Sequence, residues 1–259
     1  MIFYFSGTGN TQFIASQLAE ATGERLVPIA AAVGKGVYHF ELDANERIGI
    51  CFPVHGWRPP FIVRDFARQL RVDGYDGSQY CYGFATCGDD VGLTFDYLRE
   101  DLLAAGIKLD SEFSVIMPET YNFPIIDQID TPESAERKIA AARDRLSSLL
   151  PAVVNRQRGV KEINKSRWPR INSVMLGSYF LKHWVTDNKF TVDPEACTRC
   201  GRCQKVCPVG NIDCSNGNVP EWLHNGLCTT CFSCYHHCPA HAIDFAGRTR
   251  GKRQYYFKP

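Results

Sequence analysis

The chain begins with an apolar run over residues 1–5, and further apolar runs of strand length recur along its first 120 residues. Between them lie segments in which apolar residues recur every three or four positions, which is the spacing of one helix face. The pattern predicts strands at residues 1–5 and near 26–29, 47–53, 79–86 and 112–117, with helices near 12–21, 60–70, 91–105 and 131–149. This alternation predicts an α/β fold with a doubly wound, five-stranded parallel sheet.

The loop after the first predicted strand combines glycines with short polar side chains and reads Ser6-Gly7-Thr8-Gly9-Asn10-Thr11. Glycines let the backbone wrap closely around an anion, and the following helix contributes its positive N-terminus. The loop has neither the lysine of a P-loop NTPase nor the G-x-G-x-x-G spacing of a dinucleotide site. We therefore predict a phosphate-binding loop that uses hydroxyls and backbone amides. The alternative is a capped turn before an ordinary helix.

This loop resembles the first loop of flavodoxins, which reads [ST]-x-T-G-N-T and holds the phosphate of flavin mononucleotide (FMN). The resemblance implies strand order 2-1-3-4-5, with the flavin outside the carboxyl ends of the strands. It also implies that the flavin ring lies beside two later loops, Pro53-Val54-His55-Gly56-Trp57 and Thr86-Cys87-Gly88-Asp89. Trp57 either stacks on the ring or packs on the neighbouring prolines, and Cys87 is either a reactive thiol or a bystander. After the fifth strand, Phe123 is expected to pack, while the role of Tyr121 is left open.

Two cysteine runs follow in the last third of the chain, and both read C-x2-C-x2-C-x3-C-P. Each cysteine of the first run has a counterpart 31 positions later, which indicates an internal repeat. The spacing is the bacterial pattern for iron–sulfur clusters, in which three thiolates of one loop hold one cluster and the fourth reaches the other. We assign one [4Fe-4S] cluster to Cys197, Cys200, Cys203 and Cys238, and the second to Cys207, Cys228, Cys231 and Cys234.

Zinc and disulfides are the alternative uses of these eight cysteines. Zinc sites take four ligands, usually as two CxxC-type pairs, and would leave the eight unevenly distributed. Disulfides need an oxidising compartment, and the chain shows no leader pattern. Residues 190–245 instead resemble a two-cluster bacterial-type ferredoxin. Of the remaining cysteines, Cys51 and Cys81 are expected in the core, and Cys214 is not counted as a ligand.

Composition and charge divide the chain into four predicted parts. These are an FMN-binding domain over 1–152, a basic linker with an amphipathic helix over 153–188, a ferredoxin domain over 189–247 and a basic tail over 248–259. The net charge of +1 conceals −8 over residues 1–155 and +9 over 156–259. The basic part favours an acidic redox partner, whereas no basic-aromatic module indicates nucleic acid. The helix is expected to bury its apolar face between the domains rather than lie on a membrane, and the tail is expected to dock on the first domain.

Taken together, the motifs resemble the flavodoxin-like/ferredoxin fusion proteins of anaerobic bacteria and archaea. The resemblance implies an iron–sulfur flavoprotein that transfers electrons between two [4Fe-4S] clusters and FMN, coupling one-electron to two-electron chemistry. The alternative is a reductase whose FMN reduces a quinone, a disulfide or an unsaturated acid, with His55, Cys87 or Tyr121 as the proton donor.

The same resemblance sets the expected surroundings of the chain. A redox partner protein (a ferredoxin or a reductase) and a small-molecule acceptor are expected, and a homodimer is left open. No apolar run approaches the roughly 20 residues of a membrane span, so no transmembrane segment and a cytoplasmic location are expected. The sequence shows no acid–base pair, and we assign no catalytic residue.

Overall fold

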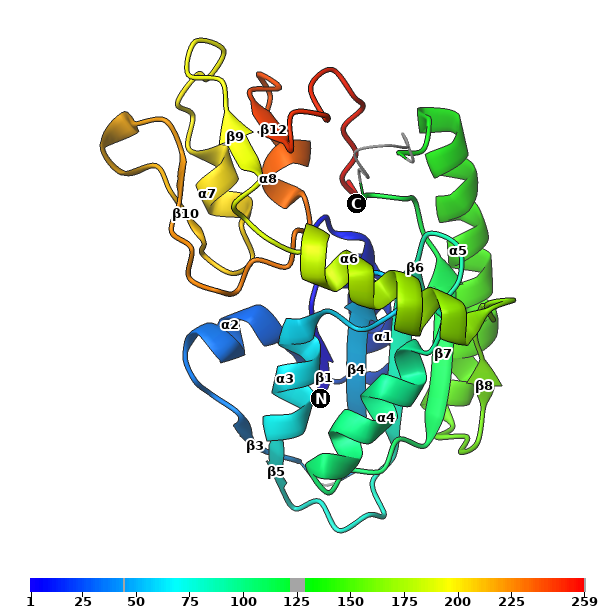
Figure 1. The fold of residues 1–259 in the computed structure, drawn as a ribbon. Coiled ribbons are helices and arrows are strands. Elements are labelled where there is room, and N and C mark those ends of the chain that lie inside the picture. Colours follow the sequence, from blue (N-terminus) through cyan, green and yellow to red (C-terminus); the bar gives the residue numbers. More distant parts are fainter. Residues whose placement is uncertain (44, 122–128, 259) are drawn as a thin grey trace.

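The computed structural model describes residues 1–43, 45–121 and 129–258, which form a larger N-terminal part and a smaller C-terminal part (Figure 1). Phe123, which was expected to pack, lies outside the described residues. Among the described residues, no helix is both long and apolar enough to cross a membrane.

The N-terminal part is built on a six-stranded, wholly parallel sheet. Its strand order is β2-β1-β4-β6-β7-β8, with bounds β2 Leu26–Pro28, β1 Ile2–Tyr4, β4 Ile48–Pro53, β6 Cys81–Cys87, β7 Ser111–Ile116 and β8 Lys161–Glu162. The α/β class with a parallel sheet is confirmed. The predicted count of five strands is wrong, because the short strand β8 comes from the basic segment predicted as linker. Two further short strands, β3 (His39–Glu41) and β5 (Arg71–Asp73), pair with each other outside this sheet.

The strands alternate their side chains between two apolar layers, as the two-residue period of a strand requires. Phe3 and Phe52 face the layer formed with α2 (Ile29–Gly34), α3 (Phe61–Gln69) and α4 (Thr94–Ala104). Ile2 and Cys51 face the layer formed with α1 (Asn10–Thr22) and α5 (Pro132–Val154). Burying a large apolar side chain stabilises a fold by about 1.5–3 kcal/mol, so these two layers fix the sheet. Cys51 is fully buried here, as predicted, and so is Cys81.

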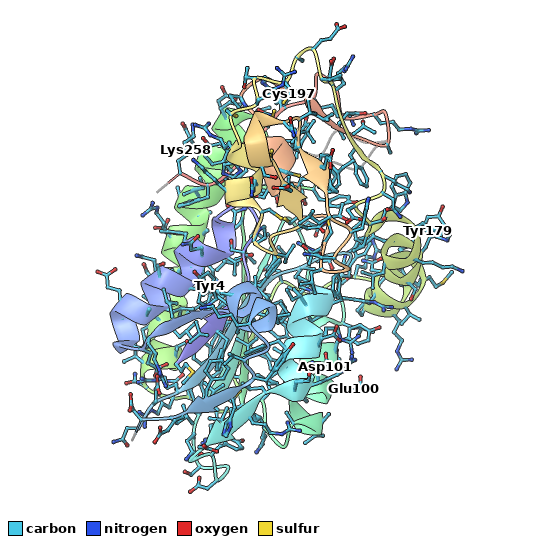
Figure 2. The ribbon with its side chains drawn as sticks, turned by 90° about the vertical axis from the view of Figure 1, so that its left-hand side faces the viewer. Tyr4, Glu100, Asp101, Tyr179, Cys197 and Lys258 are labelled. Carbon is cyan, nitrogen blue, oxygen red and sulfur yellow. The ribbon has the colours of Figure 1, made fainter. Side chains whose placement is uncertain are left out.

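One buried ion pair ties two helices together on the first of these faces. Asp101 of α4 has a buried carboxylate that accepts hydrogen bonds from the Arg64 guanidinium of α3 at 2.6 and 2.9 Å. Figure 2 labels Asp101 and its neighbour Glu100 in the lower half of the view, whereas Cys197 is near the top. This ion pair between α3 and α4 therefore lies away from the cysteine run that begins at Cys197.

The C-terminal part is small and has two antiparallel strand pairs, β12–β9 and β10–β11. Its elements are β9 (Phe190–Val192), α7 (Arg202–Val206), β10 (Ile212–Asp213), the 3-10 turn Ser215–Gly217, β11 (Glu221–Trp222), α8 (Ser233–His236) and β12 (Ile243–Phe245). Phe190, Phe232 and Phe245 form its apolar centre together with Tyr235. This α+β region holds both cysteine runs.

A continuous helical segment joins the two parts and crosses the carboxyl ends of the central strands (Figure 1). It consists of a π-helical stretch, Ile171–Leu176, followed by α6, Gly177–Trp184. Its inner side packs on the loop after β4: Ser173 donates to the Trp57 carbonyl, and Phe180 lies against Gly56. We expected the apolar face of this helix to be buried between the domains, but only the inner side is covered, because Met175 and Tyr179 are exposed. Tyr179 is labelled on this helix in Figure 2.

Candidate functional site

The first predicted cysteine set lines a single cavity. Cys197, Cys200, Cys203 and Cys238 all border it, and its empty volume is about 350 Å³. The loop that carries the first three cysteines turns sharply, because Arg199 (φ 54°) and Gly201 (φ 66°) take the left-handed conformation. The fourth, Cys238, follows α8 and comes from the other run, as the spacing predicts. Cys214, which we did not count as a ligand, borders the same cavity.

The second predicted set lines a separate cavity of about 330 Å³ with the same construction. Cys228, Cys231 and Cys234 come from one loop, in which Thr230 (φ 52°) and Phe232 (φ 58°) are left-handed. Cys207 arrives from the first run after α7. In the described part of the chain, no three His, Cys, Asp or Glu side chains converge on a point that would suit one metal ion. Each set of four cysteines lines one cavity, and four thiolates are the ligands that a [4Fe-4S] cluster takes.

The crossing cysteine of each run receives the same backbone hydrogen bond. The Asn211 amide donates to Cys207 Sγ, and the Ala242 amide donates to Cys238 Sγ, both at 3.3 Å. The two amides are 31 residues apart, as the two cysteines are. Amide donors to cluster sulfurs orient the ligands and raise the reduction potential by stabilising negative charge. The repeat is therefore preserved in the surroundings of the sulfurs as well as in their spacing.

The two cavities differ in their access to solvent. Cys200 in the first set is exposed, and the amide of Arg202 lowers the pKa of its thiol. No cysteine of the second set is exposed, although three of its four are only partly buried. Burial raises the pKa of Cys228 in the second set to about 12, as it does that of Cys203 in the first. Metal binding displaces the thiol proton in both sets. The first cavity therefore opens to solvent at Cys200, whereas the second has no exposed thiol.

Several backbone amides of the predicted phosphate loop have no hydrogen-bond partner among the described residues. Ser6 Oγ accepts the Gly9 amide at 3.2 Å, and α1 starts at Asn10. Within the described residues, no hydrogen bond is made by four further loop amides, those of Gly7, Thr8, Asn10 and Thr11, or by the Gln12 amide that follows them on α1. Thr8, Asn10 and Thr11 are buried, and buried amides without a partner are costly. A phosphate at this helix N-terminus would satisfy them.

Three segments from elsewhere in the chain hold this loop: the end of β6, the residues after β7, and the tail. Thr11 Oγ1 lies 2.8 Å from Thr86 Oγ1, and the Asn10 side chain donates to the Pro118 carbonyl at 3.0 Å. The tail lies along the other side, where the Phe257 amide donates to the Thr8 carbonyl at 2.8 Å. The tail therefore docks on the N-terminal part, as expected.

The ring of Phe257 and the nearby Tyr255 complete this docking. The Phe257 ring stacks on Phe13 with 4.6 Å between centroids. A β-carbon added at Gly9 (φ 98°) would lie 3.1 Å from the Phe257 β-carbon, so only glycine allows this approach. The Tyr255 hydroxyl donates to Asn10 Oδ1 at 3.2 Å. The tail therefore touches the phosphate loop at several points.

The loop after β4 carries the residues expected beside the ring, and helix α6 covers it. Pro53 is the last residue of β4, and the Val54 amide donates a hydrogen bond to the Thr86 carbonyl at 2.8 Å. Burial lowers the pKa of His55 to about 4, so its ring is neutral at pH 7. A β-carbon at Gly56 would lie 2.6 Å from the Phe180 ring.

Trp57 has a partner of its own in the loop after β6. Its backbone is left-handed (φ 58°), and its side chain donates a hydrogen bond to the Asp90 carboxylate. A β-carbon added at Gly92 would lie 2.6 Å from the Trp57 β-carbon. Stacking of this indole on a flavin stays a prediction, because the observed contacts join it to protein.

The loop after β6 places Cys87 in the core and brings in a carboxylate that the sequence did not single out. Cys87 is 5 % exposed, and its Sγ lies 3.6 Å from the carbonyls of Asp89 and Val115. Gly88 lies directly against Glu119, since a β-carbon there would be 2.1 Å from Oε2. Burial raises the pKa of Glu119. No sequence motif marks Glu119; its proximity to Gly88 depends on the neighbouring ends of β6 and β7.

The phosphate loop and the second cysteine set are in direct contact. A β-carbon added at Gly7 would lie 2.5 Å from the Cys231 β-carbon and 3.0 Å from its Sγ. Beside this contact, the Tyr121 ring packs edge-on against Phe232, at 5.1 Å between centroids, and against Phe180 at 4.9 Å. Tyr121 thus faces the C-terminal part, which answers the question that the sequence left open.

His236 links three segments at this junction. Its Nδ1 accepts the Tyr255 amide at 3.1 Å, and its Nε2 lies 2.7 Å from the Thr120 carbonyl. A carbonyl only accepts, so the proton is on Nε2. Burial lowers the pKa of this histidine to about 4, which keeps the ring neutral. Its role is therefore to hold the tail and the loop after β7 against α8.

Comparison with known proteins identifies the cysteine region. Residues 189–239 match the family described as 4Fe-4S dicluster domain, and residues 155–211 match a second family with the same description. These matches confirm the coarse prediction of an iron–sulfur region with two clusters. No curated protein matches this chain by sequence.

Solved structures resemble the N-terminal part only distantly. They include the Trp repressor binding protein from Bacillus subtilis, with 11 % identity and a TM-score of 0.35 over 61 % of this chain and 99 % of that one. An azoreductase from Bacillus anthracis str. Sterne has 12 % identity and a TM-score of 0.35 over 60 % and 100 %. The azoreductase AzrA has 12 % identity and a TM-score of 0.34 over 60 % and 99 %. Likenesses this slight carry no function to this chain.

Proposed function

We propose that this chain is an iron–sulfur electron-transfer protein in which two [4Fe-4S] clusters exchange electrons with an FMN held by the loop at residues 6–11. When bound, the clusters supply one-electron and the flavin two-electron redox chemistry. The observation that carries the proposal is the contact of Gly7 with Cys231, because it joins the phosphate loop to a predicted cluster ligand. Electron transfer needs the flavin ring and a cluster close together, and the loop that would anchor the flavin phosphate lies against the second cysteine set of the same chain.

The residues present fit the clusters and the phosphate group. Each cavity offers the four thiols of its predicted set, and the phosphate loop together with the first turn of α1 offers five amides without a hydrogen bond among the described residues. Cys197, Cys200, Cys203 and Cys238 would hold the outer cluster, and Cys207, Cys228, Cys231 and Cys234 the inner one. Pro53–Trp57 and Thr86–Asp89 stay the predicted ring-side residues.

The positions of the two cavities indicate at which cluster a redox partner would bind and beside which cluster the flavin would lie. The outer set reaches the surface at Cys200, and the inner set touches the phosphate loop. Around the outer set, Arg199, Arg202 and Lys205 are exposed. Basic side chains at this entrance suit an acidic redox protein, since complementary charge speeds encounter. We therefore place the partner at the outer cluster and the flavin at the inner one.

An anaerobic reductive titration of the protein, reconstituted with iron, sulfide and FMN, tests this proposal. The expected capacity is about four electrons per chain, two for the flavin and one for each cluster. Flavin and cluster absorbance should change together and reoxidise together. Binding of FMN with clusters that never exchange electrons with it would overturn the proposal, and so would a protein that fails to bind FMN.

A reductase acting on a small molecule is the second candidate, and Glu119 favours it. Its carboxyl group lies against Gly88, and burial raises its pKa, so it is better suited to donate a proton than His55 or Cys87. Turnover of a quinone, a disulfide or an unsaturated acid by the reduced protein, lost in Glu119→Gln with unchanged flavin content, would select this candidate. Electron transfer to a partner alone would leave Glu119→Gln fully active.

A further inference from the structure

The first cysteine cavity contains a fifth thiol. Cys214 Sγ lies 3.5 Å from Cys203 Sγ, and both border the cavity with Cys197, Cys200 and Cys238. Two sulfur atoms at this distance are in van der Waals contact. A ligand position at Cys203 is therefore within reach of Cys214 after a small movement.

The structure holds Cys214 in this place. It directly follows β10, which pairs with β11, and its amide donates to the Gln204 side chain at 3.0 Å. Gln204 is next to Cys203 on α7. The same helix therefore carries Cys203 and anchors the segment that brings Cys214 to it.

The repeat shows that this thiol is an addition to the two-cluster pattern. The residue 31 positions after Cys214 is Phe245, which is fully buried in the apolar centre of the C-terminal part. The second cavity therefore has no counterpart of Cys214. The remaining cysteines outside the runs, Cys51, Cys81 and Cys87, are buried in the N-terminal part. Cys214 alone among these four borders a cluster cavity in the described structure.

We propose that Cys214 is a reserve ligand of the outer cluster, able to replace Cys203 on the same iron. The exchange breaks the iron–sulfur bond of Cys203 and forms one to Cys214, while the proton of the Cys214 thiol passes to Cys203. No electron is gained or lost, so no oxidant is required. The inference rests on the proposed function, because it takes the first cavity to hold a four-iron cluster.

A fifth thiol beside Cys203 lets the outer cluster keep four ligands when that position is lost. In the described structure, the second cavity is lined by its four run cysteines and has no such additional thiol.

Alanine variants test the proposal, since alanine cannot ligate iron. The proteins are reconstituted anaerobically, and iron is counted per chain; the wild type should hold about eight. Cys203→Ala should keep about eight because Cys214 takes over, whereas Cys200→Ala, the matched control at a position that does not contact Cys214, should keep about four. Cys203→Ala combined with Cys214→Ala should also keep about four, and Cys214→Ala alone about eight.

The iron of the inner cluster shows in each case that the C-terminal part has folded. A fall of Cys203→Ala to the iron content of Cys200→Ala would overturn the proposal, and so would full iron in the double variant. A wild type with well under eight irons would instead refute the proposed function itself, so the two failures are distinguishable.

Alkylation with iodoacetamide, read by mass spectrometry on the loaded proteins, gives a second measurement. Cys214 is partly exposed, so it should be labelled in the wild type, where Cys203 binds the iron. In Cys203→Ala it should be protected, and its labelling should return after the iron is chelated. Equal labelling of Cys214 in both loaded proteins would overturn the ligand exchange.

Discussion

Gly7→Ala is the most direct test of the junction between the phosphate loop and the inner cysteine set. The new β-carbon would lie 2.5 Å from the Cys231 β-carbon. Favourable carbon contacts begin near 3.5 Å, so the two loops must separate by about 1 Å. Gly7 does not have a positive φ, so the effect comes from crowding and not from backbone strain.

The expected cost is that of adding a methyl group to a tightly packed site, about 1–3 kcal/mol. For a chain of this size each kcal/mol lowers the melting temperature by roughly 2–4 °C. Gly34→Ala is the matched control, because nothing lies within 4 Å of its added β-carbon and its φ is not positive. It should leave the melting temperature unchanged or slightly raised.

The assay combines thermal unfolding with spectroscopy of the inner cluster. In Gly7→Ala, the loaded protein should melt earlier than Gly34→Ala, and the electron paramagnetic resonance of the inner cluster should change because Cys231 has moved. The outer cluster should keep its signal. If Gly7→Ala melts with Gly34→Ala and keeps both cluster signals, the contact between the two loops does not exist as described.

Four further changes address the remaining parts of the site. Cys207→Ser should lower iron from about eight to about four per chain by removing an inner ligand; unchanged iron and spectra would refute the crossing arrangement. The double variant Thr8→Val, Thr11→Val should release FMN and spare the clusters. It removes the hydrogen bond between the Thr11 and Thr86 hydroxyls, and losing such a buried bond costs about 1–3 kcal/mol. Retained flavin would place the phosphate elsewhere. Phe257→Ala removes a buried ring, which costs about 3–5 kcal/mol of stability, and should speed hydrogen exchange at residues 253–258. Unchanged exchange would mean that the tail is held by other contacts. Burial raises the pKa of Glu119, so the folded chain keeps a proton that the unfolded chain loses above its ordinary pKa of about 4.3. The stability of the wild type therefore falls as pH rises above that value. Glu119→Gln should gain stability relative to the wild type from pH 4 to 7, and a constant difference would exclude this titration.

Local patterns in the sequence predicted much of this structure. The cysteine sets follow from spacing alone, because three ligands share one short loop and the fourth lies at a fixed distance along the repeat. The first strand, loop and helix are also local, and Ser6–Thr11 lies where the pattern placed it.

What the sequence did not predict depends on contacts between distant segments. β8 has only two residues, Lys161 and Glu162, without an apolar run, and it exists because β7 offers a free edge. Cys214 reaches the outer cavity through the pairing of β10 with β11. The approach of Gly7 to Cys231 requires the two parts to be packed together, which no single motif encodes.

The bridge at His236 has a thermodynamic consequence for the whole molecule. This histidine lies on α8 between Cys234 and Cys238, and it holds both the Tyr255 amide and the Thr120 carbonyl. Filling the cavities with iron and sulfide would stiffen the same short helix and thereby the tail along the phosphate loop. Coupling between two binding sites is reciprocal. Iron content would therefore change the affinity for a phosphate ligand, and that ligand would change the retention of iron by the same factor.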